Sequence, residues 1–187
     1  MTVWTIGHST RPIGDFLALL ARERIERLVD VRAFPGSRRY PQYNQEALAR
    51  TLKAAGIEYL HRPALGGRRR PPKGDPPSAW RNAGFRGYAA YMRTPQFHAA
   101  LDDLIALAAE RRTVIMCSEA VPWRCHRTLI ADALTARGID VEHILDASTS
   151  RHTLTKFAVV SGGEVAYPAL PEQAPTDSQH VMDLGRS

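Results

Sequence analysis

Two cysteines lie eight positions apart in a segment that also carries acidic, basic and imidazole side chains. Residues 117 to 127 read CSEAVPWRCHR, and their polar groups gather at the two ends of the segment. A thiolate is a strong nucleophile, and neighbouring cations or a helix N-terminus favour that form of cysteine. We therefore predict that Cys117 is a nucleophile and that Cys125 lies beside the ligand. Glu119 and His126 are the acid or base candidates of this segment. Free cysteine is also a common buried apolar residue, so a purely structural pair is the alternative.

Zinc binding is the competing use of these side chains. Cys117, Cys125 and His126, together with His8, would make a plausible zinc set. However, adjacent side chains such as Cys125 and His126 rarely point the same way from a helix, and the chain has no Cys-x-x-Cys pair. The sequence therefore favours a site without a metal or other cofactor. A phosphatase loop of the cysteine–arginine type is also disfavoured, because Trp123 stands six positions after Cys117, where that loop has its arginine.

Polar residues also follow two apolar segments near the N-terminus. His8 comes directly after the first segment, and either exchanges protons or hydrogen-bonds the backbone. Asp30 and Arg32 alternate along the second, so that they share one face of a strand. Asp30 would act there as a base or orient an arginine. Further candidates for binding an anionic substrate are Ser9, Arg32, Ser37, Arg38, Arg124 and Arg127.

The segment from residue 66 to 93 carries the whole excess of positive charge. It has seven basic residues and one acid, and the net charge of the chain is +6. Aromatic residues are interleaved with the arginines, which is typical of surfaces that bind nucleotides or single-stranded nucleic acid. A solvated loop that only keeps the protein in solution is the alternative. The possible nucleic-acid contacts are Arg68, Arg69, Arg70, Trp80 and Arg86; Tyr88 and Tyr91 fit better as core residues of a short helix.

Alternating strands and helices must position these groups. Short apolar segments predict five strands, and apolar residues at helical spacing predict the helices between them. This order predicts an α/β fold with a mainly parallel sheet of about five strands and helices on both faces. The predicted strands cover residues 3–6, 28–31, 57–60, 113–116 and 141–145, and a hairpin is possible at 157–167.

The carboxyl ends of parallel strands meet at one edge of the sheet, where ligands bind in such folds. The segments at 7–10, 30–39 and 117–127 each follow a predicted strand. We therefore expect them to form one polar site. The long Pro-, Gly- and Arg-rich stretch from 62 to 83 is either functional or disordered.

Length and composition limit the remaining possibilities. At 187 residues we expect one domain, residues 1–167, followed by a flexible tail at 168–187. No apolar stretch is long enough to span a bilayer, and the N-terminus lacks the features of a secretory signal. We expect a cytoplasmic protein without a membrane partner, in which both cysteines are reduced. The sequence leaves the oligomeric state open.

In order along the chain, several short motifs resemble those of the family called domain of unknown function 488. The resemblance covers about residues 3–145, and each piece is weak alone while the ordered set is specific. It implies a small α/β domain of bacteria and archaea with a shared site, but no established activity. The matching pieces are Gly7-His8-Ser9, Asp30-Val31-Arg32 with Pro35 and Ser37, Tyr59 with His61, Leu65-Gly66-Gly67, Phe85-Arg86-Gly87-Tyr88 with Tyr91-Met92, Cys117 with Glu119, and Cys125-His126-Arg127.

The leading hypothesis is an enzyme that uses the Cys117 thiolate on a phosphate-bearing substrate. A non-catalytic nucleic-acid-binding module that uses the segment 66–93 is the second hypothesis. A third is a domain that binds a small molecule or a partner and whose polar cluster is structural.

Overall fold

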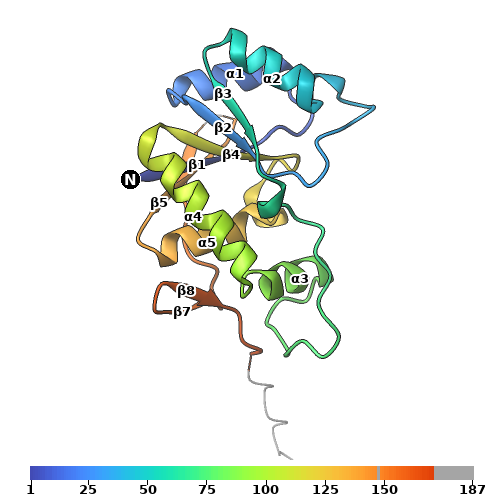
Figure 1. Cartoon of the computed structure of the whole chain (residues 1–187), viewed down its shortest axis with the longest axis vertical. Helices are drawn as coiled ribbons and strands as arrows, with labels where there is room; N and C mark the ends of the chain where they lie inside the picture. Colours follow the sequence, from blue (N-terminus) through green and yellow to red (C-terminus); the bar gives the residue numbers. More distant parts are fainter. Residues whose placement is uncertain (147, 171–187) are drawn as a thin grey trace, which may run out of the picture.

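A six-stranded sheet forms the centre of the computed structural model, which describes residues 1–146 and 148–170 (Figure 1). The strands lie in the order β3-β2-β4-β1-β5-β6, and all neighbours are parallel except β6, which is antiparallel to β5. The strands of this sheet are β1 (Thr2–Gly7), β2 (Arg27–Asp30), β3 (Glu58–His61), β4 (Thr113–Cys117), β5 (Asp140–Ile144) and β6 (Thr149–Arg151).

Helices cover both faces of the sheet, as the alternation of strands and helices predicts. Helices α1 (Ile13–Arg22) and α2 (Gln45–Ala54) pack on one face, over Trp4 and Ile6 of β1. The other face carries Val3 of β1 and the helices α3 (Ala83–Tyr91), α4 (Pro95–Glu110) and α5 (Arg127–Ala136). Successive residues of a strand point to opposite faces, so Thr5 and Cys117 lie on the same face as α5.

The topology reverses its direction between β1 and β4. From β1 the chain moves by way of α1 and α2 towards β3, whereas from β4 it crosses by way of α5 towards β5. Connections that leave neighbouring strands in opposite directions open a crevice at the carboxyl edge. At this crevice Gly7 pairs with Cys117, and the backbone N–H of His8 donates to the Cys117 carbonyl at 3.0 Å.

The C-terminal part of the described chain packs below this sheet. Strands β7 (Val159–Ser161) and β8 (Glu164–Ala166) form the expected hairpin, and Tyr167 packs into the core beside α5 (Figure 1). Strand β6 is missed by the sequence prediction because its residues Thr-Ser-Arg carry no apolar pattern. The predicted tail lies largely outside the described residues, which end at 170.

Short elements shape the loops of the carboxyl edge. These are the 3₁₀ turns η1 (Pro41–Tyr43), η2 (Pro63–Leu65) and η3 (Pro122–Arg124). Asn44 precedes α2 but does not cap it with its side chain, because its Oδ1 accepts from the Ser37 N–H at 2.6 Å. This contact holds the loop after β2 against the start of α2. In the described part of the chain, no helix has the length and apolar character needed to cross a membrane.

Candidate functional site

A cleft of about 710 Å³ opens at the carboxyl edge, above the ends of β1, β2 and β4. Most of the predicted site residues line it. The contributing segments come from five parts of the chain, so the fold brings the separate polar segments together as expected. The predicted residues in the lining are His8, Ser9, Arg32, Ser37, Arg68, Cys117, Glu119, Arg124, Cys125 and His126; the aromatic residues, which the sequence reading did not assign to this site, are Phe34, Tyr40, Phe85 and Tyr88.

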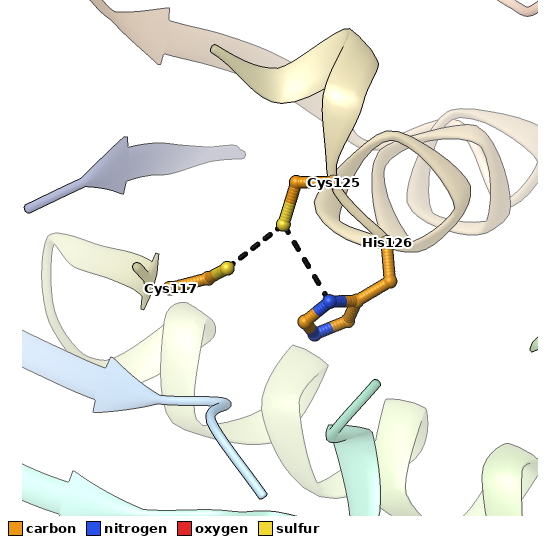
Figure 2. A group of neighbouring side chains, drawn as sticks. All are labelled: Cys117, Cys125 and His126. Carbon is orange, nitrogen blue, oxygen red and sulfur yellow. Dashed lines mark hydrogen bonds between the residues drawn. The ribbon is translucent and has the colours of Figure 1, made fainter. Parts of the chain in front are cut away.

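Three side chains form what we call the thiol cluster: Cys117, Cys125 and His126 (Figure 2). The Sγ atoms of Cys117 and Cys125 lie 2.8 Å apart, and the Nδ1 atom of His126 lies 3.5 Å from Cys125 Sγ. Cys117 ends β4, while Cys125 and His126 precede the first turn of α5. Both cysteines are buried and free, and both line the cleft.

The negative charge of the thiol pair is favoured on Cys125. Burial alone would raise the pKa of Cys125, but the hydrogen bond with Cys117 and the nearby Arg127 outweigh burial and lower it to about 6. The same hydrogen bond, together with burial, raises the pKa of Cys117 well above its usual value. A thiol that donates to a neighbouring thiolate stabilises it, which accounts for the opposite directions. The arrangement therefore favours the thiolate on Cys125, with Cys117 as its hydrogen-bond donor. The prediction that Cys117 itself attacks stays a prediction.

Arg127 lies behind the cysteines rather than in the cleft. Its side chain is 1% exposed, and the hydrogen bonds found for it within the described residues go to neutral oxygens. These acceptors are Thr5 Oγ1 at 3.3 Å and the carbonyl oxygens of Glu119, at 2.5 Å, and Ala120. A buried guanidinium without a carboxylate partner is costly. A thiolate at Cys125 supplies the missing negative charge.

His126 also keeps unused hydrogen-bonding capacity. Its Nε2 atom is buried and has no partner among the described residues. Burial lowers the pKa of His126, so the ring is neutral near pH 7. Gly67 makes room for the ring, because a Cβ there would lie 2.8 Å from Nδ1. Unsatisfied buried polar atoms are rare in proteins and often mark a functional site.

His8, Arg32 and Asp30 form a second polar group on the cleft floor. Asp30 is fully buried and holds Arg32 through contacts of 2.5–3.1 Å, and Tyr59 donates to Asp30 at 2.8 Å. Asp30 is absent from the cleft lining and therefore orients Arg32 rather than meeting a ligand. The ring of His8 stacks on Tyr43, and burial lowers its pKa to about 4. His8 is therefore neutral at pH 7, with its Nδ1 donating to the Ser9 carbonyl at 2.9 Å and its Nε2 3.3 Å from Arg32 Nη1.

Gly7 allows the loop after β4 to cross the end of β1. A Cβ at this position would lie 1.7 Å from the carbonyl oxygen of Glu119 and 2.8 Å from Arg127 Nη2. Any other residue must push the loop or the guanidinium away. The glycine of the Gly7-His8-Ser9 motif is thus explained by a close approach of backbone to backbone.

Metal binding fits the thiol cluster poorly. Cys117, Cys125 and His126 are the group of candidate ligands found among the described residues. A structural zinc site takes four ligands, and this group supplies three. His8, the expected fourth ligand, instead bonds the Ser9 carbonyl and contacts Arg32. We therefore treat the cluster as a pair of thiols.

A family model described as domain of unknown function DUF488 matches residues 12–134. This is more than half of the chain. The chain belongs to the DUF488 family. The match includes Asp30, Arg32 and the whole thiol cluster, and confirms the resemblance drawn from the ordered motifs. No curated protein and no solved structure matches the chain.

This DUF488 chain also holds a set of buried polar residues, most of them outside the matched region, that the sequence prediction missed. His143 accepts from Thr5 Oγ1 at 2.8 Å and contacts His152 at 3.0 Å, and His152 contacts Asp132 at 2.8 Å. Thr155 and Tyr167 donate to the same carboxylate. We call this set the histidine network; its members are Thr5, Asp132, His143, His152, Thr155 and Tyr167. The sequence feature that could have revealed this network is Asp132, an acid within the apolar stretch Leu129–Leu134.

The predicted nucleic-acid contacts divide between the cleft and the core of this DUF488 chain. Arg68 lines the cleft, where its guanidinium lies over the ring of Phe34. Arg69 stacks on Tyr91 and donates to two carbonyl oxygens, and so ties its loop to α3. Trp80 stacks on Phe85 and packs against the core, and Arg86 donates to the Arg81 carbonyl. Arg70 is exposed. Arg38, predicted to bind the anion, is also exposed and lies outside the cleft lining.

Proposed function

We propose that the chain is an enzyme that acts through a cysteine thiolate on an anionic, phosphate-bearing substrate bound in the cleft. The observation that carries the proposal is the pairing of Arg127, buried without a carboxylate partner among the described residues, with two thiols 2.8 Å apart. An arginine held in this way stabilises a thiolate at neutral pH. We expect the enzyme to act in the cytoplasm, where both thiols are kept reduced.

The cleft offers positive charge for the substrate. Arg32, Arg68 and Arg124 line it, together with the hydroxyl groups of Ser9 and Ser37. Asp30 fixes Arg32 and uses its Nε and Nη2 groups, so Nη1, which also contacts His8, is the group left for a ligand beside the charges of Arg68 and Arg124. A fixed arginine suits a phosphate, because its N–H groups match the phosphate oxygens.

Each polar group of the cleft then has a role. Cys125 attacks the electrophilic atom of the substrate, while Cys117 donates its S–H to the thiolate. As the bond to sulfur forms, the bond to the leaving group breaks, and Glu119 gives the leaving group a proton at the open side of the cleft. Neutral His126, with His8 as the second candidate, then takes a proton from the water that displaces Cys125 from this intermediate. Gly7 and Arg127 position the loop that carries Glu119.

Nucleic-acid binding is the second candidate function, and Phe34 favours it. Its ring is 72% exposed at the cleft, with Arg68 lying over it. An exposed ring beside arginine is suited to stacking on a base. A nucleic-acid-binding module requires an affinity for single strands that falls steeply with salt. If that affinity is unchanged between low and moderate salt, this candidate is excluded.

Protection of the thiol against alkylation tests the enzyme proposal. Iodoacetamide labelling of Cys125, followed by mass spectrometry, is measured with inorganic phosphate or an aryl phosphate and with chloride at equal ionic strength. A phosphorylated compound at ten times its Kd slows labelling about tenfold. The double variant Arg68→Ala/Arg124→Ala loses this protection, and Arg50→Ala on the exposed side of α2 keeps it. Equal labelling rates in phosphate and chloride would contradict the proposal, and release of the aryl alcohol reports turnover.

A further inference from the structure

The two sulfurs of the thiol cluster lie closer together than an enzyme with one attacking cysteine requires. Cys117 Sγ and Cys125 Sγ lie 2.8 Å apart, and a disulfide bond is about 2.05 Å long. The sulfurs therefore need to approach by less than about 1 Å. Figure 2 shows both side chains pointing toward each other from separate elements, the end of β4 and the turn before α5.

We propose that Cys117 and Cys125 form an oxidative modification site, at which a hydroperoxide oxidises Cys125 and Cys117 closes a disulfide. Both cysteines line the cleft of about 710 Å³, which admits a small hydroperoxide. His126 Nδ1 lies 3.5 Å from the Cys125 sulfur, and Arg127 behind that sulfur stabilises the thiolate that attacks the hydroperoxide. Nothing in the family description assigns this modification.

The chemistry balances in two steps. In the first, the Cys125 sulfur attacks the terminal oxygen of the hydroperoxide, the O–O bond breaks, and the alkoxide leaves as an alcohol after it takes a proton. Cys125 is then a sulfenic acid. In the second, Cys117 attacks the Cys125 sulfur, the S–O bond breaks, and the hydroxide leaves as water with the proton of Cys117. The two thiols lose two electrons and the hydroperoxide gains them, and a cellular dithiol reverses the change.

Oxidation has a direct consequence for the cleft. The disulfide joins β4 to the start of α5 and removes the sulfur that attacks the substrate in the proposed function. The consequence for activity rests on that proposed function, whereas disulfide formation itself rests only on the two sulfurs. The modification would therefore turn the enzyme off reversibly under oxidising conditions.

Counting free thiols after peroxide treatment tests the inference. The full chain is exposed to hydrogen peroxide, quenched, unfolded and alkylated, and the adducts are counted by mass. The reduced protein takes two adducts, and we expect the oxidised protein to take none and to be 2 Da lighter, reversibly with dithiothreitol. We expect Cys117→Ser to stop at a sulfenic acid on Cys125 that dimedone traps, and Cys125→Ser to lose the rapid reaction.

The outcomes separate this inference from the proposed function. A wild-type protein in which Cys125 proceeds to sulfinic acid while Cys117 stays free would overturn the inference. A stoichiometric zinc ion that protects both thiols would also overturn it. If the disulfide forms but phosphate gives no protection against alkylation, only the proposed function fails. If phosphate protects Cys125 but no disulfide forms, only the inference fails.

Discussion

The thiol cluster and the histidine network both border Arg127, and they differ in how completely their polar atoms are paired. In the histidine network each member has a hydrogen-bond partner, and Asp132 accepts four hydrogen bonds although it is fully buried. In the thiol cluster His126 Nε2 has no partner among the described residues, and the thiols contact mainly each other. The polar atoms of the histidine network are thus satisfied within the protein, whereas the thiol cluster retains an atom that a ligand can bind.

This difference separates a structural role from a functional one. A fully paired buried network fixes one packing arrangement, because any rearrangement leaves a donor or an acceptor unsatisfied. The histidine network also fixes Arg127, through Thr5 at 3.3 Å. The thiol cluster uses that fixed charge and retains the free capacity that chemistry needs. Loss of stability should therefore follow changes in the network, and loss of reactivity should follow changes in the cluster.

The largest loss of stability is expected from Asp132→Ala. The change leaves the donors of His152, Thr155 and Tyr167 without their acceptor, so the free energy of unfolding should fall by about 3–5 kcal/mol. Chemical denaturation measures the change. Asp102→Ala, at an exposed ion pair on α4, is the matched control and should cost less than about 1 kcal/mol. Equal losses in free energy of unfolding in the two variants would contradict the conclusion that the histidine network stabilises the protein more than a surface ion pair does.

A smaller loss with a functional consequence is expected from Gly7→Ala. The added Cβ meets the Glu119 carbonyl, so the loop and Arg127 must shift at a cost of about 1–3 kcal/mol. Displacement of Arg127 should also raise the pKa of Cys125. Gly14→Ala, within α1 and with open space around it, should instead stabilise by about 0.5–1 kcal/mol. An unchanged Cys125 pKa in a folded Gly7→Ala protein would show that Arg127 does not control the thiol.

The most gradual effect, which is spread over about two pH units, concerns the neutral histidines. Burial and the neighbouring His152 and Arg127 lower the pKa of His143 from 6.5 to about 3, and burial lowers that of His8 to about 4. Between pH 6.5 and 4.5 the unfolded chain takes up protons that the folded chain does not. The free energy of unfolding should therefore fall as pH falls, by up to about 1.4 kcal/mol per pH unit for each histidine.

Denaturation curves between pH 6.5 and 4.5 measure this slope. His143→Asn should reduce the slope of the free energy of unfolding against pH. His8→Asn, at the cleft, should reduce it as well. A free energy of unfolding that stays constant over this range would mean that both rings take up protons in the folded protein as readily as in the unfolded chain.

Periodicity predicted most of the fold, because strands and helices bury apolar residues at regular spacing. The segments around Val3, Leu28 and Val114 form the strands expected there, and Thr94 caps α4 with its side chain. Strand β6 escaped prediction because its position depends on pairing with β5 rather than on its own polar residues. The hydroxyl groups and rings of the histidine network are far apart in sequence, so only the folded chain shows that they meet.

The candidate site was predicted from residue types and from the edge at which parallel strands end. The role of each site residue, in contrast, depends on contacts and distances that only the folded chain shows. Arg127 stands among the predicted anion-binding residues, yet it lies behind the thiols and meets Thr5. Asp30 remains a partner of Arg32, which is one of the two roles that the sequence left open. The thiolate is favoured on Cys125 because Cys117 and Arg127 both lower its pKa, and no spacing in the sequence reveals these contacts.

The pH dependence of alkylation tests the assignment of the thiolate to Cys125 most directly. The wild type is compared with Cys117→Ser, which retains a donor, Cys117→Ala, which removes it, and Cys125→Ser. The groups that face Cys125 are Cys117 from β4, His126 and Arg127 before and within α5, and Tyr88 from α3. We predict labelling of Cys125 with a midpoint near pH 6, kept in Cys117→Ser and raised in Cys117→Ala. Labelling of Cys117 below pH 7 in the Cys125→Ser protein, with Cys125 unreactive in the Cys117→Ser protein, would contradict the assignment.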